Sequence, residues 1–197
     1  MDFIQTYCVL DEGDRLLCVG GDWDAFAEEN GGADCTGANV AGKHYFSGIE
    51  GFETRSFLNA ATFAVRDRKR QFVMDYRCDS PVIRRFMRLT VSPLRHNRLL
   101  MVHDFLHEEK AGDPGPVWLF APDAKVRKCS VCCSVEFGEV WMDPYLSKHP
   151  RPQFVTYTMC PKCRKHAADS LSVASTPMRL ETKVVRFSRR AGGAKPG

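Results

Sequence analysis

The sequence predicts an α+β protein, in which an antiparallel five-stranded sheet with helices on one face is followed by a small β-rich module. Three observations lead to this fold class. Short β-prone runs open the first 110 residues, stretches with the two-residue period of strands close them, and helical periodicity lies between. Two C-x-x-C pairs stand near the end of the chain. The balance of charge also differs between the two halves.

The composition is that of a folded protein. Of the 197 residues, 44% are hydrophobic and 26% are charged, which is enough to bury an ordinary core. The opening MDFIQTYCVLDEGD is acidic where a secretory signal is basic, and no apolar run approaches the roughly 18 residues of a membrane helix. We therefore expect a soluble, cytoplasmic protein without membrane contacts.

The charge divides the chain into an acidic and a basic half. Residues 1–122 contain 14 Lys and Arg against 18 Asp and Glu, whereas residues 123–197 contain 14 against 6. Only the second half is expected to meet an anionic partner. Gly and Pro in KAGDPGPVWLFAPDAK predict a linker. The predicted parts are a sheet domain (1–110), a linker (111–124), a cysteine module (125–170) and a flexible basic tail (171–197).

The N-terminal elements follow from local patterns. YCVLD and LLCVGG are short β-prone runs, and the EGDR between them predicts a hairpin. In GDWDAFAEENGG, Asp22 can cap a short helix that Gly31 and Gly32 end. The small residues that follow predict turns and single helical turns.

The main helix is predicted over FETRSFLNAATFAVRDRKR. Leu58, Ala61, Thr62 and Val65 recur there at helical spacing, and basic residues in the last turn complement the helix dipole. The period then changes to two, so QFVMDYRC, RRFMRLTV and RLLMVHDFLHEE predict three antiparallel strands. The residues expected on one face of these strands include Phe72, Met74, Tyr76, Cys78, Met87, Leu89 and Val91.

A helix packed on this sheet leaves an interior that can hold a small ligand. We expect this pocket beneath residues 57–65, on the strand faces opposite the charged side chains. The predicted pocket residues are Phe57, Tyr76, Met87, Leu89 and His103.

The stretch YRCDSP has two interpretations. Asp-Ser-Pro is a turn signal, and Cys78 is then a small buried hydrophobe on the same face as Tyr76. Alternatively, Arg77 and Asp79 bind a polar ligand or a partner, and Cys78 is redox-active. We favour the turn.

The segments DWDAFAEEN, VAGKHYFSGIEGFETR and YRCDSPVIRRFMRLTVSPL occur in an order that resembles a bacterial PAS domain over roughly residues 3–109. In this resemblance they correspond to the first helix, the turn into the middle helices, and the third and fourth strands. The resemblance implies a sensor or docking domain that holds a haem, a flavin, a small metabolite or nothing. It also implies a homodimer.

Two cofactor-binding subgroups of PAS domains are not supported by the motifs. The haem type takes an axial His from the long helix, which has none here, and the flavin type has an Asn-Cys-Arg-Phe motif from which ADCTGANVAG around Cys35 departs. Haem ligation by His44 or His103 stays open as an alternative to a structural role. His103 and His107 do not form a recognisable metal pair.

The strongest pattern is Cys129-x2-Cys132 followed, after 27 residues, by Cys160-x2-Cys163. Nine cysteines, an odd number, in a chain without an export signal indicate reduced thiols. The two pairs predict a structural zinc ion bound by four thiolates, with no open position for catalysis. Cys133 is an alternative ligand, although the two-residue spacing favours Cys132. A thioredoxin-like dithiol is a further alternative, but the βαβ context is missing.

CSVCCSVEFGEVW and YTMCPKC resemble the C-terminal cysteine module of some bacterial PAS proteins, which extends the resemblance to about Arg164. The leading hypothesis is a PAS-type sensor that signals through a partner protein or a homodimer. The alternative is a nucleic-acid-binding regulator that uses the zinc module and the tail, where residues 183–197 contain five basic and no acidic residues. An enzyme is least favoured, because no catalytic motif is found.

Overall fold

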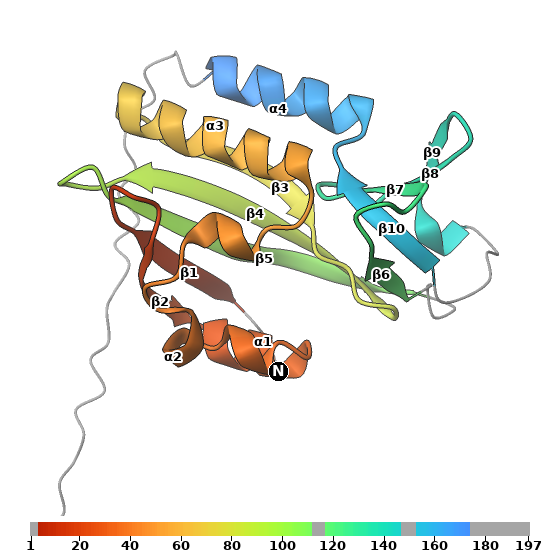
Figure 1. Cartoon of the computed structure of the whole chain (residues 1–197), viewed down its shortest axis with the longest axis horizontal. Helices are drawn as coiled ribbons and strands as arrows, with labels where there is room; N and C mark the ends of the chain where they lie inside the picture. Colours follow the sequence, from red (N-terminus) through yellow and green to blue (C-terminus); the bar gives the residue numbers. More distant parts are fainter. Residues whose placement is uncertain (1–3, 112–116, 147–152, 174–197) are drawn as a thin grey trace, which may run out of the picture.

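The computed structural model describes residues 4–111, 117–146 and 153–173. These residues form two five-stranded sheets and four α-helices (Figure 1). The predicted α+β class is therefore confirmed.

The first sheet consists of β1 (Gln5–Leu10), β2 (Leu16–Gly21), β3 (Phe72–Arg77), β4 (Ile83–Pro93) and β5 (Leu99–Lys110). All its pairings are antiparallel, and the strand order is β2-β1-β5-β4-β3. This is the antiparallel five-stranded sheet that the sequence predicts. The long strands β4 and β5 pair near its centre, and β3 forms one edge.

One face of this sheet is buried. Leu10 pairs with Leu99 and Val91 pairs with Met101, and all four residues are 0% exposed. Because side chains alternate along a strand, the other buried residues of β1, β3 and β4 share this face. They include Cys8, Phe72, Met74, Met87 and Leu89, as the two-residue period predicts for β3 and β4.

Helices cover the buried face. They are α1 (Trp23–Glu29), α2 (Gly37–Val40) and α3 (Phe52–Arg68), with the 3-10 turns η1 (Ala33–Cys35) and η2 (Tyr45–Gly48). Ala61, Thr62 and Val65 are the buried residues of α3, as its spacing predicts. Phe57 of α3 meets the ring of Phe72 edge to face, with 5.8 Å between the ring centroids.

Asp22 precedes α1, but its side chain does not cap the helix. The carboxylate instead accepts hydrogen bonds from the backbone N–H groups of Ile4 and Gln5, at 2.8 and 3.2 Å. The predicted capping bond is therefore wrong, because the start of the first strand competes for the same oxygen.

The second sheet consists of β6 (Trp118–Phe120), β7 (Val126–Cys129), β8 (Val135–Phe137), β9 (Val140–Met142) and β10 (Gln153–Thr158). Its order is β6-β10-β7-β8-β9, with β10 parallel to both β6 and β7. β6 lies within residues 111–124, the segment predicted as a linker. The turn η3 (Pro144–Leu146) follows β9, and α4 (Pro161–Val173) follows β10.

The cysteine module shares its core with the first sheet. Cys129, Met159 and Cys163 belong to the same buried cluster as Phe72 and Met74. α4 contacts both β3 and α3, and Figure 1 shows it alongside α3. The two predicted parts are therefore packed as one body. Of the predicted basic tail (171–197), residues 171–173 end α4, and the rest lies outside the described residues.

Across the described ranges, no helix combines the length and the apolar character that crossing a membrane requires.

Candidate functional site

The sulfur atoms of the two C-x-x-C pairs lie together. Cys129 ends β7, Cys132 lies in the turn after it, and Cys160 and Cys163 stand at the start of α4. The four Sγ atoms are within 4.8 Å of one another, and those of Cys132 and Cys160 are 3.8 Å apart. A tetrahedral site with Zn–S bonds of about 2.3 Å has sulfur–sulfur separations of about 3.8 Å. The predicted ligands therefore meet with the spacing that a metal ion such as zinc needs.

Cys133 turns away from this cluster. Its backbone is left-handed, with φ 61°, and its Sγ donates a hydrogen bond to the carbonyl oxygen of Arg77 at 3.5 Å. Cys132 is therefore the fourth sulfur of the cluster, as the two-residue spacing predicts.

Hydrogen bonds connect the sulfur atoms with nearby backbone N–H groups and with one another. The N–H of Cys160 donates to Sγ of Cys129 at 3.3 Å, and the N–H of Cys163 donates to Sγ of Cys160 at 3.4 Å. Hydrogen bonds from Cys129 and Cys163 lower the pKa of Cys132, and the bonds to Cys132 raise the pKa of Cys129 and of Cys163, so without an ion the sulfurs share one thiolate at Cys132. Because the thiolate is the form that binds a metal, binding of an ion by all four sulfurs would release the protons of the remaining thiols. Four sulfur ligands suit zinc.

The first turn of α3 holds both cysteine turns. The carboxylate of Glu53 accepts hydrogen bonds from the N–H of Met159, at 3.2 Å, and from the hydroxyl of Thr158. Oγ1 of Thr54 lies 2.7 Å from Oγ of Ser130, in the other turn. The long helix of the first domain therefore fixes the two halves of the sulfur cluster.

A glycine permits this close approach. Gly51, just before α3, has φ +85°, and a Cβ there would lie 2.5 Å from the carbonyl oxygen of Tyr157 in β10. Glycine alone accepts both the backbone angle and the contact.

The hydrogen bond from Thr158, with contributions from the N–H of Met159 and from Arg164, lowers the pKa of Glu53. The carboxylate is therefore ionised where α3 meets the module.

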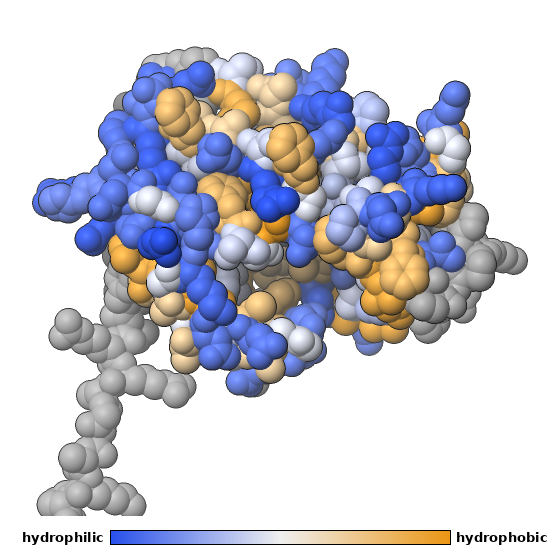
Figure 2. All heavy atoms as spheres, in the orientation of Figure 1, coloured by the Kyte–Doolittle hydropathy of each residue, from blue (hydrophilic) through white to orange (hydrophobic). Residues whose placement is uncertain are grey.

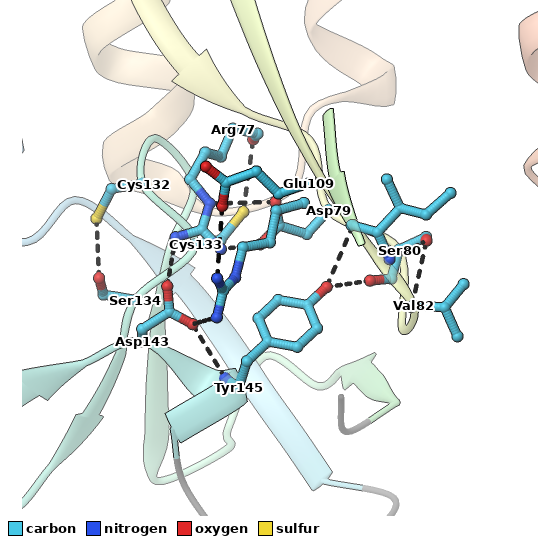
Figure 3. Close-up of polar contacts among 12 residues, drawn as sticks. Arg77, Asp79, Ser80, Val82, Glu109, Cys132, Cys133, Ser134, Asp143 and Tyr145 are labelled. Carbon is cyan, nitrogen blue, oxygen red and sulfur yellow. Dashed lines mark hydrogen bonds and ion pairs between the residues drawn. The ribbon is translucent and has the colours of Figure 1, made fainter. Parts of the chain in front are cut away.

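Arg77 joins the end of β3 to the first cysteine turn (Figure 3). The backbone N–H of Arg77 donates a hydrogen bond to the carbonyl oxygen of Val131 at 2.7 Å. Its guanidinium pairs with Asp79 and, at 2.7 Å, with Asp143. The Ser80 N–H donates to the Ile83 carbonyl at 2.9 Å, which closes the turn favoured for YRCDSP. Arg77 and Asp79 are thus engaged in ion pairs within the protein.

η3 completes this junction (Figure 3). Arg84 pairs with Asp143 at 3.6 Å and with Glu109 at 3.5 Å, and its guanidinium lies 4.7 Å from the ring centre of Tyr145. The Tyr145 hydroxyl donates to the carbonyl oxygen of Ser80. No local motif marks these residues, because their partners are distant in the sequence.

A cavity of about 310 Å³ lies between α1 and the buried face of the first sheet. Figure 2 shows a hollow beside α1 with apolar atoms in its wall. Tyr76 and His103 line the cavity, whereas Phe57, Met87 and Leu89 pack elsewhere on the buried face. The full set of lining residues is Thr6, Trp23, Phe26, Ala27, Asn30, Gly32, Cys35, Tyr76 and His103.

Tyr76 and His103 form a neutral polar pair in this wall. The Tyr76 hydroxyl is 2.7 Å from Nδ1 of His103. Burial lowers the pKa of His103 to about 4 and raises the pKa of Tyr76 well above its usual value. Both groups are therefore uncharged at neutral pH. The other histidine considered for haem, His44, is exposed and accepts a hydrogen bond from the N–H of Phe46 at 3.3 Å.

Cys78 follows the end of β3 and is half-buried. Burial raises its pKa, so the thiol stays protonated and unreactive at neutral pH. A protonated, half-buried thiol fits the turn interpretation of YRCDSP better than a redox-active cysteine.

Comparison with known proteins assigns no family to this chain. No protein-family model matches it, and no curated protein matches it. We therefore infer its function from its own residues and geometry.

Proposed function

We propose that the chain is a PAS-type sensor, which changes a protein contact when a small ligand occupies the cavity under α1. One observation carries this proposal. Tyr76 lines the cavity, and the next residue, Arg77, binds the first cysteine turn through the carbonyl oxygen of Val131. A shift of β3 at the cavity is therefore transmitted to the cysteine module within one residue.

The order of elements supports the PAS resemblance. Two strands, short helical turns, one long helix and three strands follow one another along the chain. The helices cover one face of the sheet and leave beside α1 a cavity that opens to the surface, which is where a PAS sensor would hold its ligand.

In this proposal the four cysteines hold one structural zinc ion. Cys129, Cys132, Cys160 and Cys163 supply four thiolates, so the ion has no open position for a substrate. The ion joins the end of β7 to the start of α4. Its role is to keep the module in the position from which α3 and β3 contact it.

We propose that the output is a contact with a partner protein or with a second copy of the chain. The module exposes apolar side chains, and Figure 2 shows such residues gathered over β6 and β10. Apolar patches favour a protein partner, whereas nucleic acids are bound chiefly through basic side chains. The exposed residues include Leu119, Phe120, Val140, Met142, Leu146 and Phe154.

The proposal is tested by a substitution that fills the cavity with a large side chain. Ala27 lines the cavity, so Ala27→Trp places an indole ring where a ligand would lie. We expect a changed rate of amide hydrogen exchange at residues 131–133, with zinc content unchanged. Ala60→Trp is the matched control, because Ala60 is exposed on α3. If folded Ala27→Trp exchanges at these residues like the control, the cavity does not communicate with the module and the proposal fails.

A further inference from the structure

Arg85 is a buried cation without a buried anion. It is 5% exposed and lies two residues before Met87, on the same face of β4. Arg84 and Arg88 on the same strand pair with the carboxylates of Glu109 and Asp75. No carboxylate of the described ranges pairs with Arg85. A buried charge in this state is costly unless an anion offsets it.

Arg85 stands directly behind the wall of the cavity. Its Nη1 donates to Oδ1 of Asn30 at 2.9 Å, and its guanidinium lies 5.6 Å from the ring centre of Phe26. Asn30 and Phe26 both line the cavity. A guanidinium has five N–H donors, and the bond to Asn30 uses one of them. The positive charge is therefore held next to the cavity with donors to spare.

We propose that the cavity binds a small monocarboxylate, whose carboxylate is attracted to Arg85 and whose apolar part packs on Trp23 and Phe26. This inference rests on the proposed function, because it names the ligand class of the sensor cavity. Arg85 is not among the side chains that line the cavity, so a carboxylate beside Asn30 and Phe26 is attracted to the guanidinium through space and offsets its charge.

A monocarboxylate fits the cavity better than a phosphate or a polyanion. Phosphate sites gather several cationic side chains or a helix N-terminus. The lining residues of the cavity include no Lys or Arg, and Arg85 contacts two of them, Asn30 and Phe26, from behind. A volume of about 310 Å³ is at the small end of ligand pockets, which span about 300–1,000 Å³. The ligand is therefore small, mainly apolar and singly charged.

The test compares two probes of nearly equal shape, phenylacetate and its neutral amide phenylacetamide, on the full-length zinc-loaded protein. Trp23 lines the cavity, so its fluorescence reports binding. We expect phenylacetate to bind about 10 times more tightly than phenylacetamide, because the charge of Arg85 attracts the carboxylate across the wall of the cavity.

Variants of β4 locate the source of this preference. Arg85→Gln removes the charge and keeps a donor for Asn30, so we expect it to bind the two probes equally. Arg85→Lys keeps a positive charge and should retain a preference for phenylacetate, which provides a result if Arg85→Gln does not fold. Arg88→Gln is the matched control, because Arg88 is exposed and paired with Asp75. It should behave as the unmodified protein.

The outcomes separate this inference from the proposed function. Equal binding of the two probes by the unmodified protein overturns the carboxylate class and leaves the sensor cavity in place. Binding of neither probe, or a preference that Arg85→Gln retains, also overturns the inference. The sensor proposal fails separately, when Ala27→Trp leaves hydrogen exchange at residues 131–133 unchanged.

Discussion

Glu53, in the first turn of α3, accepts a hydrogen bond from the backbone N–H of Met159, the residue before Cys160. The same carboxylate accepts hydrogen bonds from Thr158 and Arg164. Three donors of the cysteine module therefore converge on one side chain of the helix that covers the first sheet. The helix and the second cysteine turn are fastened together at this point.

Glu53→Gln should weaken these hydrogen bonds between α3 and the cysteine module. We expect the free energy of unfolding to fall by about 1 kcal/mol, a value reduced for the partial exposure of the side chain. Because the pKa of Glu53 is lowered, its contribution is present above the ordinary Glu pKa of about 4.3 and is lost as the pH falls below it. Urea unfolding at neutral pH measures the change. Glu29→Gln, at an exposed carboxylate of α1, is the control, and equal stability of the two variants contradicts the prediction.

Gly51→Ala should separate α3 from β10. Gly42 has a similar backbone, with φ +78° against +85°, but nothing lies within 4 Å of a Cβ placed there. Gly42→Ala therefore carries only the cost of the backbone angle. Gly51→Ala also forces a contact with the Tyr157 carbonyl, so we expect it to be less stable than Gly42→Ala by a further ~1–3 kcal/mol. Thermal unfolding of both variants measures the stability that each one loses. Equal losses of stability would show that β10 moves away from the added methyl group without destabilising the protein.

Local periodicity is what made the faces of the elements predictable. Met87 and Leu89 on β4, and Ala61 and Val65 on α3, are buried as the sequence indicates. The cysteine cluster was predictable for the same reason, since each C-x-x-C pair is a short local motif.

The contacts between the two parts could not be predicted in this way. Arg77 pairs with Asp143, 66 positions along the chain, and no local pattern connects them. Trp118, within the predicted linker, pairs with Gln153 in a parallel ladder. Such pairings depend on tertiary packing, and they join the two predicted domains into one buried core.

Cys160→Ser tests both the ion and this shared core. We expect loss of the proposed zinc ion, which metal analysis of the purified protein measures. Cys160 is 3% exposed and lies in the same buried cluster as Phe72, so its replacement should destabilise the first sheet as well as the module. The sequence alone suggests instead that the N-terminal domain stays folded.

The control for this experiment is Cys133→Ser. Cys133 is buried but its sulfur contacts the Arg77 carbonyl, so the variant should keep one zinc ion per chain. Zinc retained in full by Cys160→Ser contradicts the ligand assignment. A second, undisturbed unfolding transition in Cys160→Ser contradicts the shared core.

His103 should remain neutral across the physiological range. Burial lowers its pKa to about 4, whereas the unfolded chain has a His pKa of about 6.5. Between these values the unfolded state binds a proton that the folded state does not, so the contribution of His103 to stability rises with pH and is lost as the pH falls. We expect the NMR signals of its imidazole to stay constant from about pH 7.5 to about pH 5.5, a range above the lowered value. In His103→Gln, stability should depend less steeply on pH over the same range. A midpoint near 6.5 would mean that bulk water surrounds the ring, and Tyr76 and His103 would then not form the closed, neutral end of a ligand cavity.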